Sequence, residues 1–107
     1  MNGATEKPVI DVEALRNRLI TRLGQVIDPE TGVDIIRMRL VEDLQVRDDG
    51  FVSYKFRPSS PFCPLAVPLA VQIKRAVAEM EGVTAQEITV VGYVGAADLN
   101  RLLQEQV

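Results

Sequence analysis

The sequence of 107 residues contains no histidine and only one cysteine, Cys63. Without histidine the chain cannot build a Ser-His-Asp triad, a Cys-His pair or a histidine metal site, and it lacks the usual imidazole general base. A single thiol excludes an internal disulfide and any zinc finger formed by this chain alone. We therefore expect a protein of the reducing cytoplasm, and we expect no enzyme activity, since no general base for the cysteine is evident.

The chain also lacks a concentrated basic face and a long apolar run. It carries 12 Lys and Arg against 15 Asp and Glu, a net charge of −3. The basic residues are scattered apart from two short pairs, Arg37/Arg39 and Lys55/Arg57, so we expect no nucleic-acid partner. The longest apolar stretch, 65–71, is too short to span a bilayer, and no secretory signal precedes it, so we expect no membrane partner.

The remaining composition is that of one ordinary globular domain, with 47% apolar and 25% charged residues. We predict a flexible polar arm over residues 1–10 and a single domain over 11–107. Periodicity predicts helices over 11–27, from about 67 to 82 and after Gly95, and strands over 40–46, 51–56 and 88–94. The order helix–strand–strand–helix–strand–helix predicts a small α+β domain with helices packed on a short mixed sheet.

The strand patterns differ in how their faces are used. Apolar and polar residues alternate over 51–56, which predicts one covered and one wetter side of the sheet. Strand 88–94 is apolar on both faces and is predicted to be internal. Four apolar residues of this strand and the last helix form either a self-pairing surface for a homodimer or part of the core: Val91, Tyr93, Leu99 and Leu103.

Cys63 stands in the stretch SSPFCPLA, at the predicted start of the second helix. In one interpretation it packs as a small hydrophobe, covered by Phe62 and Leu65. In the other it is an exposed, reactive thiol, because a helix N-terminus favours the thiolate and the hydroxyls of Ser59 and Ser60 offer donors to a bound anion or sulfur. The residues alone leave both interpretations open.

The stretch DPETG contributes a second candidate pair, Asp28 and Glu30. The spacing by itself favours a turn that ends the first helix, since the residue before a proline disfavours the helical region. The alternative is a carboxylate pair on a rigid turn, able to ligate a metal or to hydrogen-bond a partner.

Together, DPETGVDII, the hairpin, SSPFCPLA, an amphipathic helix and ITVVGY resemble the PaaD/SufT-like proteins of metal–sulfur (iron–sulfur) cluster assembly, from Leu15 to Leu103. The resemblance implies a compact cytoplasmic α+β domain that acts in cluster assembly or in delivery to target proteins. It also implies that the carboxylate turn lies beside the cysteine loop. The site it implies, for cluster, metal or client, consists of Asp28, Glu30, Ser59, Ser60 and Cys63, with Cys63 as the metal ligand.

Two places depart from the family pattern. Members usually have threonine where Ser59 stands, a change that keeps the hydroxyl. Members often read D-L-G-L-V where this chain reads RMRLV at 37–41, so Arg37 and Arg39 replace an acidic residue and a glycine.

The expected function is that of an accessory or targeting factor. Iron–sulfur clusters usually take four protein ligands, so one cysteine predicts at most a transient cluster or iron, none held stably by the monomer. The expected partners are iron–sulfur assembly or client proteins, and a homodimer. Two alternatives stay open: a non-catalytic interaction module in which Cys63 is structural, and a thiol enzyme without an evident base.

Overall fold

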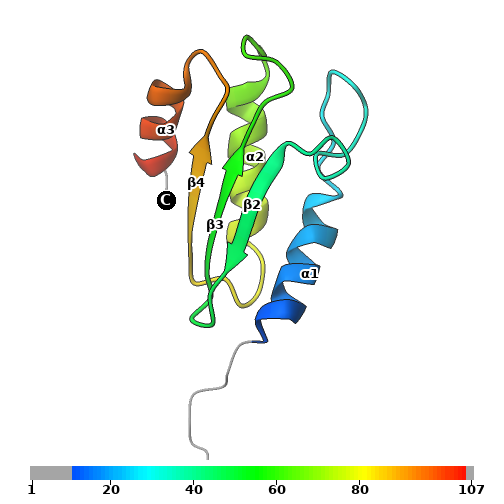
Figure 1. Cartoon of the computed structure of the whole chain (residues 1–107), viewed down its shortest axis with the longest axis vertical. Coiled ribbons are helices and arrows are strands. Elements are labelled where there is room, and N and C mark those ends of the chain that lie inside the picture. The colour runs from blue at the N-terminus through cyan, green and yellow to red at the C-terminus, as the bar shows by residue number, and fades with distance from the viewer. Residues whose placement is uncertain (1–10, 106–107) are drawn as a thin grey trace, which may run out of the picture.

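The computed structural model describes residues 11–105, which form three helices and a three-stranded sheet (Figure 1). In chain order the elements are α1 (Val12–Leu23), β2 (Val41–Val46), β3 (Phe51–Phe56), α2 (Ala66–Ala78), β4 (Ala85–Val90) and α3 (Ala96–Glu105). The predicted α+β class and order of elements are confirmed. Over this part of the chain, no helix has the length and apolar character needed to cross a membrane. The predicted flexible arm, 1–10, lies outside the described residues.

The sheet is mixed and has the strand order β2-β3-β4. β2 pairs antiparallel with β3, and β3 pairs parallel with β4 through the α2 crossover. In Figure 1, α2 lies behind the sheet, while α1 and α3 flank β2 and β4. β4 is therefore an edge strand, and the prediction that 88–94 is an internal strand was wrong. The pairing with β3 stops at Val90, after which the apolar run continues as a loop.

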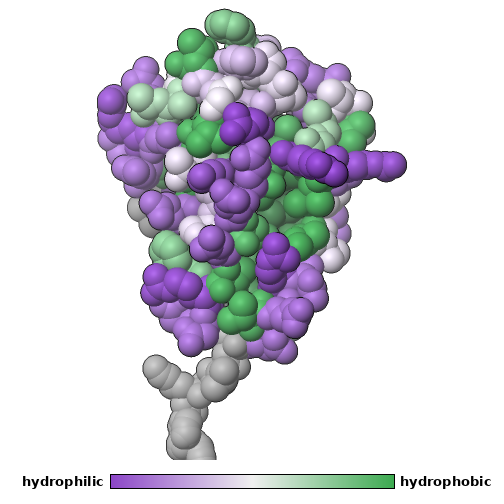
Figure 2. Space-filling model, viewed as in Figure 1, coloured by the Kyte–Doolittle hydropathy of each residue, from purple (hydrophilic) through white to green (hydrophobic). Residues whose placement is uncertain are grey.

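The core lies between the sheet and α2, as the alternation in β3 predicted. Val52, Tyr54 and Phe56 are buried, whereas Lys55 points to the open face of the sheet and is exposed. Figure 2 shows hydrophilic side chains along the middle of this face. The helices add their apolar stripes to the same core, with buried Leu15, Leu19 and Leu23 from α1, Leu69, Ile73 and Val77 from α2, and Leu99 and Leu103 from α3. For the last two the sequence left a self-pairing surface and the core as alternatives. They are 3% and 1% exposed, so both belong to the core and not to a self-pairing surface.

α1 begins where the sequence predicts and ends earlier. The Asp11 carboxylate accepts a hydrogen bond from Ala14 N at 3.1 Å, which makes it the N-cap. The helix stops at Leu23, followed by Gly24, instead of continuing to residue 27. Ile27 is already part of a short antiparallel bridge with Asp34, so the Asp-Pro step lies within the reversal over residues 28–33.

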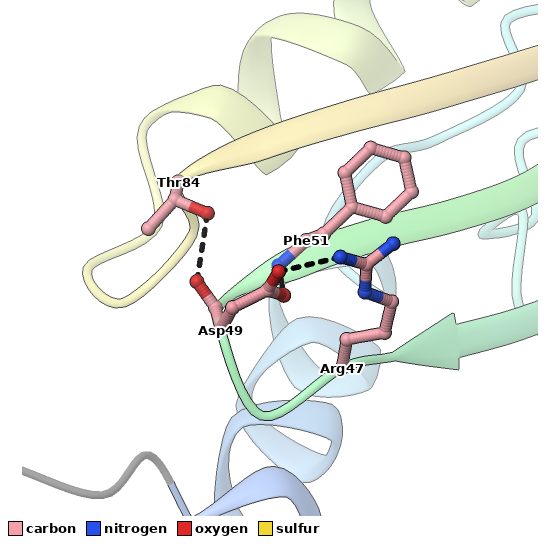
Figure 3. Close-up of polar contacts among 4 residues, drawn as sticks. All are labelled: Arg47, Asp49, Phe51 and Thr84. Atoms are coloured by element: carbon pink, nitrogen blue, oxygen red, sulfur yellow. Dashed lines mark hydrogen bonds and ion pairs between the residues drawn. The ribbon is translucent and has the colours of Figure 1, made fainter.

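The β2–β3 hairpin is fixed at its turn and tied to the start of β4 (Figure 3). Asp49 accepts a hydrogen bond from Phe51 N at 3.0 Å and pairs with Arg47 at 2.6 Å, and the Arg47 guanidinium lies over the Phe51 ring. The Phe51 N–H, followed by Arg47, lowers the pKa of the Asp49 carboxyl. The Thr84 hydroxyl donates to Asp49 O at 2.9 Å, which joins the hairpin to the α2–β4 connection.

Candidate functional site

Three loops meet at one end of the molecule because β3 and β4 are parallel and their carboxyl ends lie at the same edge (Figure 1). These are the loops 24–40, 57–65 and 91–95. Backbone hydrogen bonds join them directly: Arg57 N donates to Leu40 O at 2.7 Å, and Val94 N donates to Pro61 O at 2.8 Å. The predicted carboxylate turn and cysteine loop both belong to this end.

Cys63 lies inside this end and not on its surface. Its backbone N–H donates to Ser60 O at 3.1 Å, and its carbonyl accepts from Ala66 N at 3.3 Å. These two tight turns direct the thiol into the core, where Cys63 is 2% exposed. The expectation of an exposed loop cysteine was therefore wrong. Phe62, which was expected to help cover the thiol, points outward instead and is 74% exposed.

The Cys63 thiol donates to the Glu30 carboxylate, with 3.8 Å between Sγ and Oε1. The two residues are 33 positions apart in the sequence. The predicted proximity of the carboxylate turn to the cysteine loop is thereby confirmed. Glu30 itself is exposed, so it stands between the buried thiol and solvent.

Asp28 holds the turn in shape and keeps one oxygen unused. Its Oδ1 accepts from Glu30 N at 2.9 Å, and its backbone bonds to Val33 and Gly32 close the loop. The residue is 1% exposed, and Oδ2 finds no hydrogen-bond partner among the described residues. A buried carboxylate oxygen without a partner is costly. The turn does not end α1, which stops five residues earlier, so that interpretation was wrong.

The two serines contribute differently to the loop. The Ser60 hydroxyl oxygen accepts from Phe62 N at 3.2 Å and stabilises the turn that carries Cys63. Ser59 is exposed. Within residues 11–105, neither serine hydroxyl hydrogen-bonds to the Cys63 thiol or to the Glu30 carboxylate, and no three Cys, Asp or Glu side chains gather as a metal site.

Arg39 adopts a left-handed backbone conformation, with φ of 60°. Glycine adopts the left-handed region freely, whereas a residue with a Cβ does so at a free-energy cost. A glycine therefore suits this position. The neighbouring Arg37 donates its backbone N–H to the Asp34 carboxylate at 2.9 Å. Both arginines are exposed on the loop that carries Asp28 and Glu30.

Two exposed apolar residues at this end were missed by the sequence analysis. Phe62 and Val94 are 74% and 71% exposed, and they belong to the two loops that the Val94–Pro61 hydrogen bond joins. In the sequence, each is an apolar residue in a loop rich in proline or glycine, outside the repeating apolar pattern of any helix or strand. That signal does not distinguish a buried side chain from an exposed one.

Comparison with known proteins identifies the class. A model of the iron–sulfur cluster assembly protein family matches residues 16–90, so the chain belongs to this family. The resemblance drawn from the motifs is confirmed, and family membership assigns the chain a role in iron–sulfur protein assembly.

Individual relatives are similar over most of the chain, and one of them is named for iron–sulfur protein maturation. An uncharacterized protein, MJ1129 of Methanocaldococcus jannaschii, is 39% identical over 88 residues, which cover 82% of this chain and 93% of the relative. The Fe-S protein maturation auxiliary factor YitW of Bacillus subtilis is 37% identical over 79 residues, covering 74% and 78%. The crystal structure of a domain of unknown function, DUF59, from Bacillus anthracis superposes with a TM-score of 0.67 at 32% identity, covering 74% and 76%.

Proposed function

We propose that this chain is an accessory or targeting factor that handles iron or an iron–sulfur cluster as transient cargo and passes it to client proteins. The observation that carries the proposal is the 3.8 Å contact between the Cys63 thiol and the Glu30 carboxylate, made across 33 residues of sequence. Thiolate and carboxylate oxygen are both ligands that iron accepts. Family membership supports iron–sulfur cargo over other metals.

The side chains at this site have distinct roles in the proposal. Cys63 supplies the one soft ligand, Glu30 an adjacent oxygen ligand, and the unpartnered Oδ2 of Asp28 a further oxygen that a cation would satisfy. Ser59 and Ser60 line the cysteine loop, where their hydroxyls can donate to a cluster sulfur once the loop opens. Because Cys63 is buried, the loop must move before cargo reaches the thiol, which fits transient handling.

The remaining ligands come from outside the monomer. A cluster usually takes four protein thiolates, and this chain has one cysteine. An assembly protein, a client protein or a second copy of this chain supplies the others. A free thiol suits a reducing compartment, so the proposed location is the cytoplasm.

Cobalt(II), a spectroscopic substitute for iron(II), tests the ligand assignment. Added anaerobically to the wild type, it should give a thiolate-to-metal charge-transfer band. Cys63→Ala should abolish the band, and Glu30→Gln should weaken binding about tenfold. Glu87→Gln removes an equivalent exposed carboxylate from the open face of the sheet and should leave binding unchanged. A wild type without the band, or a band that survives Cys63→Ala, would overturn the assignment.

The burial of Cys63 favours a second candidate, an interaction module in which the cysteine is structural. The two candidates separate in cells that depend on this protein for iron–sulfur enzyme activity. If Cys63→Ala accumulates to the wild-type level and sustains full enzyme activity, the thiol handles no cargo and the interaction module is correct. Loss of enzyme activity at normal protein level supports the cargo proposal.

A further inference from the structure

We propose that the free edge of β4 binds an extended polypeptide segment of a partner protein, which joins the sheet as a fourth strand. The binding site, called here the β4 edge, consists of the outward backbone groups of Gln86 and Ile88 and the cavity beside them. β4 begins at the end of the sheet opposite the loops that carry Cys63 (Figure 1). The inference goes beyond the proposed function, and the binding requires no metal.

The backbone groups of β4 point alternately toward β3 and away from it. The Val91 N–H donates to Phe56 O on β3 at 3.0 Å, whereas the Val90 N–H points the other way and donates to Asn100 on α3 at 2.7 Å. Groups on the same side of a strand recur at every second residue. Gln86 and Ile88 therefore direct their backbone N–H and C=O groups away from β3, on the same side as Val90.

These outward groups of Gln86 and Ile88 are unpaired. Among residues 11–105, no hydrogen bond satisfies them on the side away from β3. Ile88 is only 6% exposed, and a backbone polar group that is neither paired nor fully hydrated is costly. A strand placed along this edge would supply both the donors and the acceptors that the two residues lack.

A cavity of about 490 Å³ gives such a strand room beside the edge. Its lining combines the first part of β4, through Ile88, with Leu103 and Gln104 of α3 and with Lys74 of α2. In Figure 1, α3 lies beside the carboxyl-terminal half of β4, and the amino-terminal half continues beyond it. The covered half and the open half of the edge thus follow each other along one strand.

The covered half identifies the chemistry of the occupant. The Asn100 side-chain amide accepts from Val90 N at 2.7 Å and donates to Val90 O at 3.2 Å. An amide that donates and accepts at one residue makes the same two bonds as a residue of a paired strand. The position next to the open half is therefore already filled by the group that a polypeptide backbone repeats, and an extended segment continues that line past Ile88 and Gln86.

The other edge of the sheet is protected against such pairing. β2 carries an irregularity in its register between Glu42 and Gln45, and Asp43 within it has φ of 54°. Bulges and charged side chains are the means by which edge strands avoid added strands. β4 pairs with β3 in unbroken register from Ala85 to Val90, so its edge keeps the regular spacing that a further strand needs.

A second copy of this chain fits the β4 edge poorly. In an antiparallel pair of two copies, Gln86 of one copy must face Ile88 of the other for both residues to be paired in each. This register sets the two Glu87 side chains directly opposite each other on the open face, and like charges in that position are destabilising. The occupant is therefore a segment of a different protein.

The two faces of the sheet set the side-chain pattern of the occupant. Side chains of β4 alternate between the face covered by α2 and the open face, where Ala85, Glu87 and Thr89 are exposed. An added strand alternates in the same way. Its side chains on the covered face enter the cavity beside Leu103 and should be apolar, whereas those on the open face meet solvent and should be polar.

The experiment uses the metal-free full-length chain and a fluorescein-labelled heptapeptide of alternating valine and serine, followed by fluorescence anisotropy. Two further peptides carry N-methyl groups, one on the inner valines and the other on the serines. Only every second N–H of a bound strand faces its neighbour. One methylated peptide should therefore bind at least about tenfold more weakly than the unmodified peptide, and the other should bind like it. The sensitive set reports whether the segment runs parallel or antiparallel to β4.

Matched variants place the peptide at the β4 edge. Gln104→Trp adds a bulky ring at the cavity from an exposed position on α3 and should weaken binding at least about tenfold. Arg101→Trp adds the same ring at an exposed position of α3 outside the cavity lining and should bind like the wild type. Circular dichroism checks that both variants keep the fold.

Four results would overturn the inference. They are no binding by the wild type, equal binding of the two methylated peptides, equal binding by Gln104→Trp and Arg101→Trp, and a dimer of the free chain that the peptide dissociates, which would assign the edge to a second copy. Because no metal is present, such a result leaves the cargo proposal standing. Failure of the cobalt test likewise leaves the β4 edge standing.

Discussion

Replacing Arg39 with glycine should make the protein more stable. Arg39 has φ of 60°, and a left-handed conformation costs a residue with a Cβ about 1–2 kcal/mol. Glycine removes this cost. It also gives the unfolded chain more conformational freedom, which lowers the gain in the free energy of unfolding by about 0.5–1 kcal/mol. The arginine side chain is exposed and forms no ion pair within residues 11–105, so its removal loses little. We expect a net gain in the free energy of unfolding of about 0.5–1 kcal/mol.

The matched control is Arg37→Gly, two residues away. Arg37 is also an exposed arginine, but it is not among the residues with positive φ. Glycine there brings only the added freedom of the unfolded chain, so the variant should lose about 0.5–1 kcal/mol. The two substitutions change charge and side chain identically and differ only in the backbone conformation of the site.

Urea unfolding followed by circular dichroism measures both variants. The midpoint should rise for Arg39→Gly and fall for Arg37→Gly, with an unchanged dependence on urea concentration. The melting temperature of Arg39→Gly should rise by about 4 °C. An Arg39→Gly protein less stable than the wild type, or equal shifts in both variants, would refute the argument from backbone strain.

Three further predictions concern ionisable side chains. Burial raises the pKa of Tyr54, whose hydroxyl donates to Gln86 at 2.7 Å. Above pH 10 the unfolded chain loses this proton first, so the free energy of unfolding should fall by up to about 1.4 kcal/mol per pH unit, and Tyr54→Phe should remove that slope. The pKa of Asp49 is lowered, chiefly by the Phe51 N–H, so its contribution to stability is present at neutral pH and is lost below about pH 4; acid unfolding of Asp49→Asn should lack that component. Iodoacetamide should alkylate Cys63 at least about tenfold more slowly in native than in urea-unfolded protein, and equal rates would contradict its burial.

Elements with strong local patterns were predictable from the sequence. The period of α1 and the Asp11 cap identify a helix and its first residue, because capping and side-chain spacing involve neighbours within one turn. Alternation in β3 fixes which side chains face the core. The juxtaposition of Glu30 and Cys63 was expected from the family resemblance, and the structure shows it directly.

The errors share a different origin. Strand 88–94 was expected inside the sheet because it is apolar, yet β4 is an edge strand whose exposed side is covered in part by α3. The Asn100 side chain accepts from Val90 N at 2.7 Å and donates to Val90 O at 3.2 Å, so a helix side chain takes the place of a neighbouring strand. Strand order depends on such contacts between distant segments, and the pattern of one segment does not contain them.

The sequence by itself determined the type and order of the elements and the family, since these follow from local periodicity and motif. The tertiary structure decided that Cys63 points inward, that Phe62 and Val94 point outward, and that Arg39 is left-handed. A loop side chain has no periodic face to direct it. Its orientation is set by hydrogen bonds to other loops, such as Val94 to Pro61 and Arg57 to Leu40, which exist only after the chain has folded.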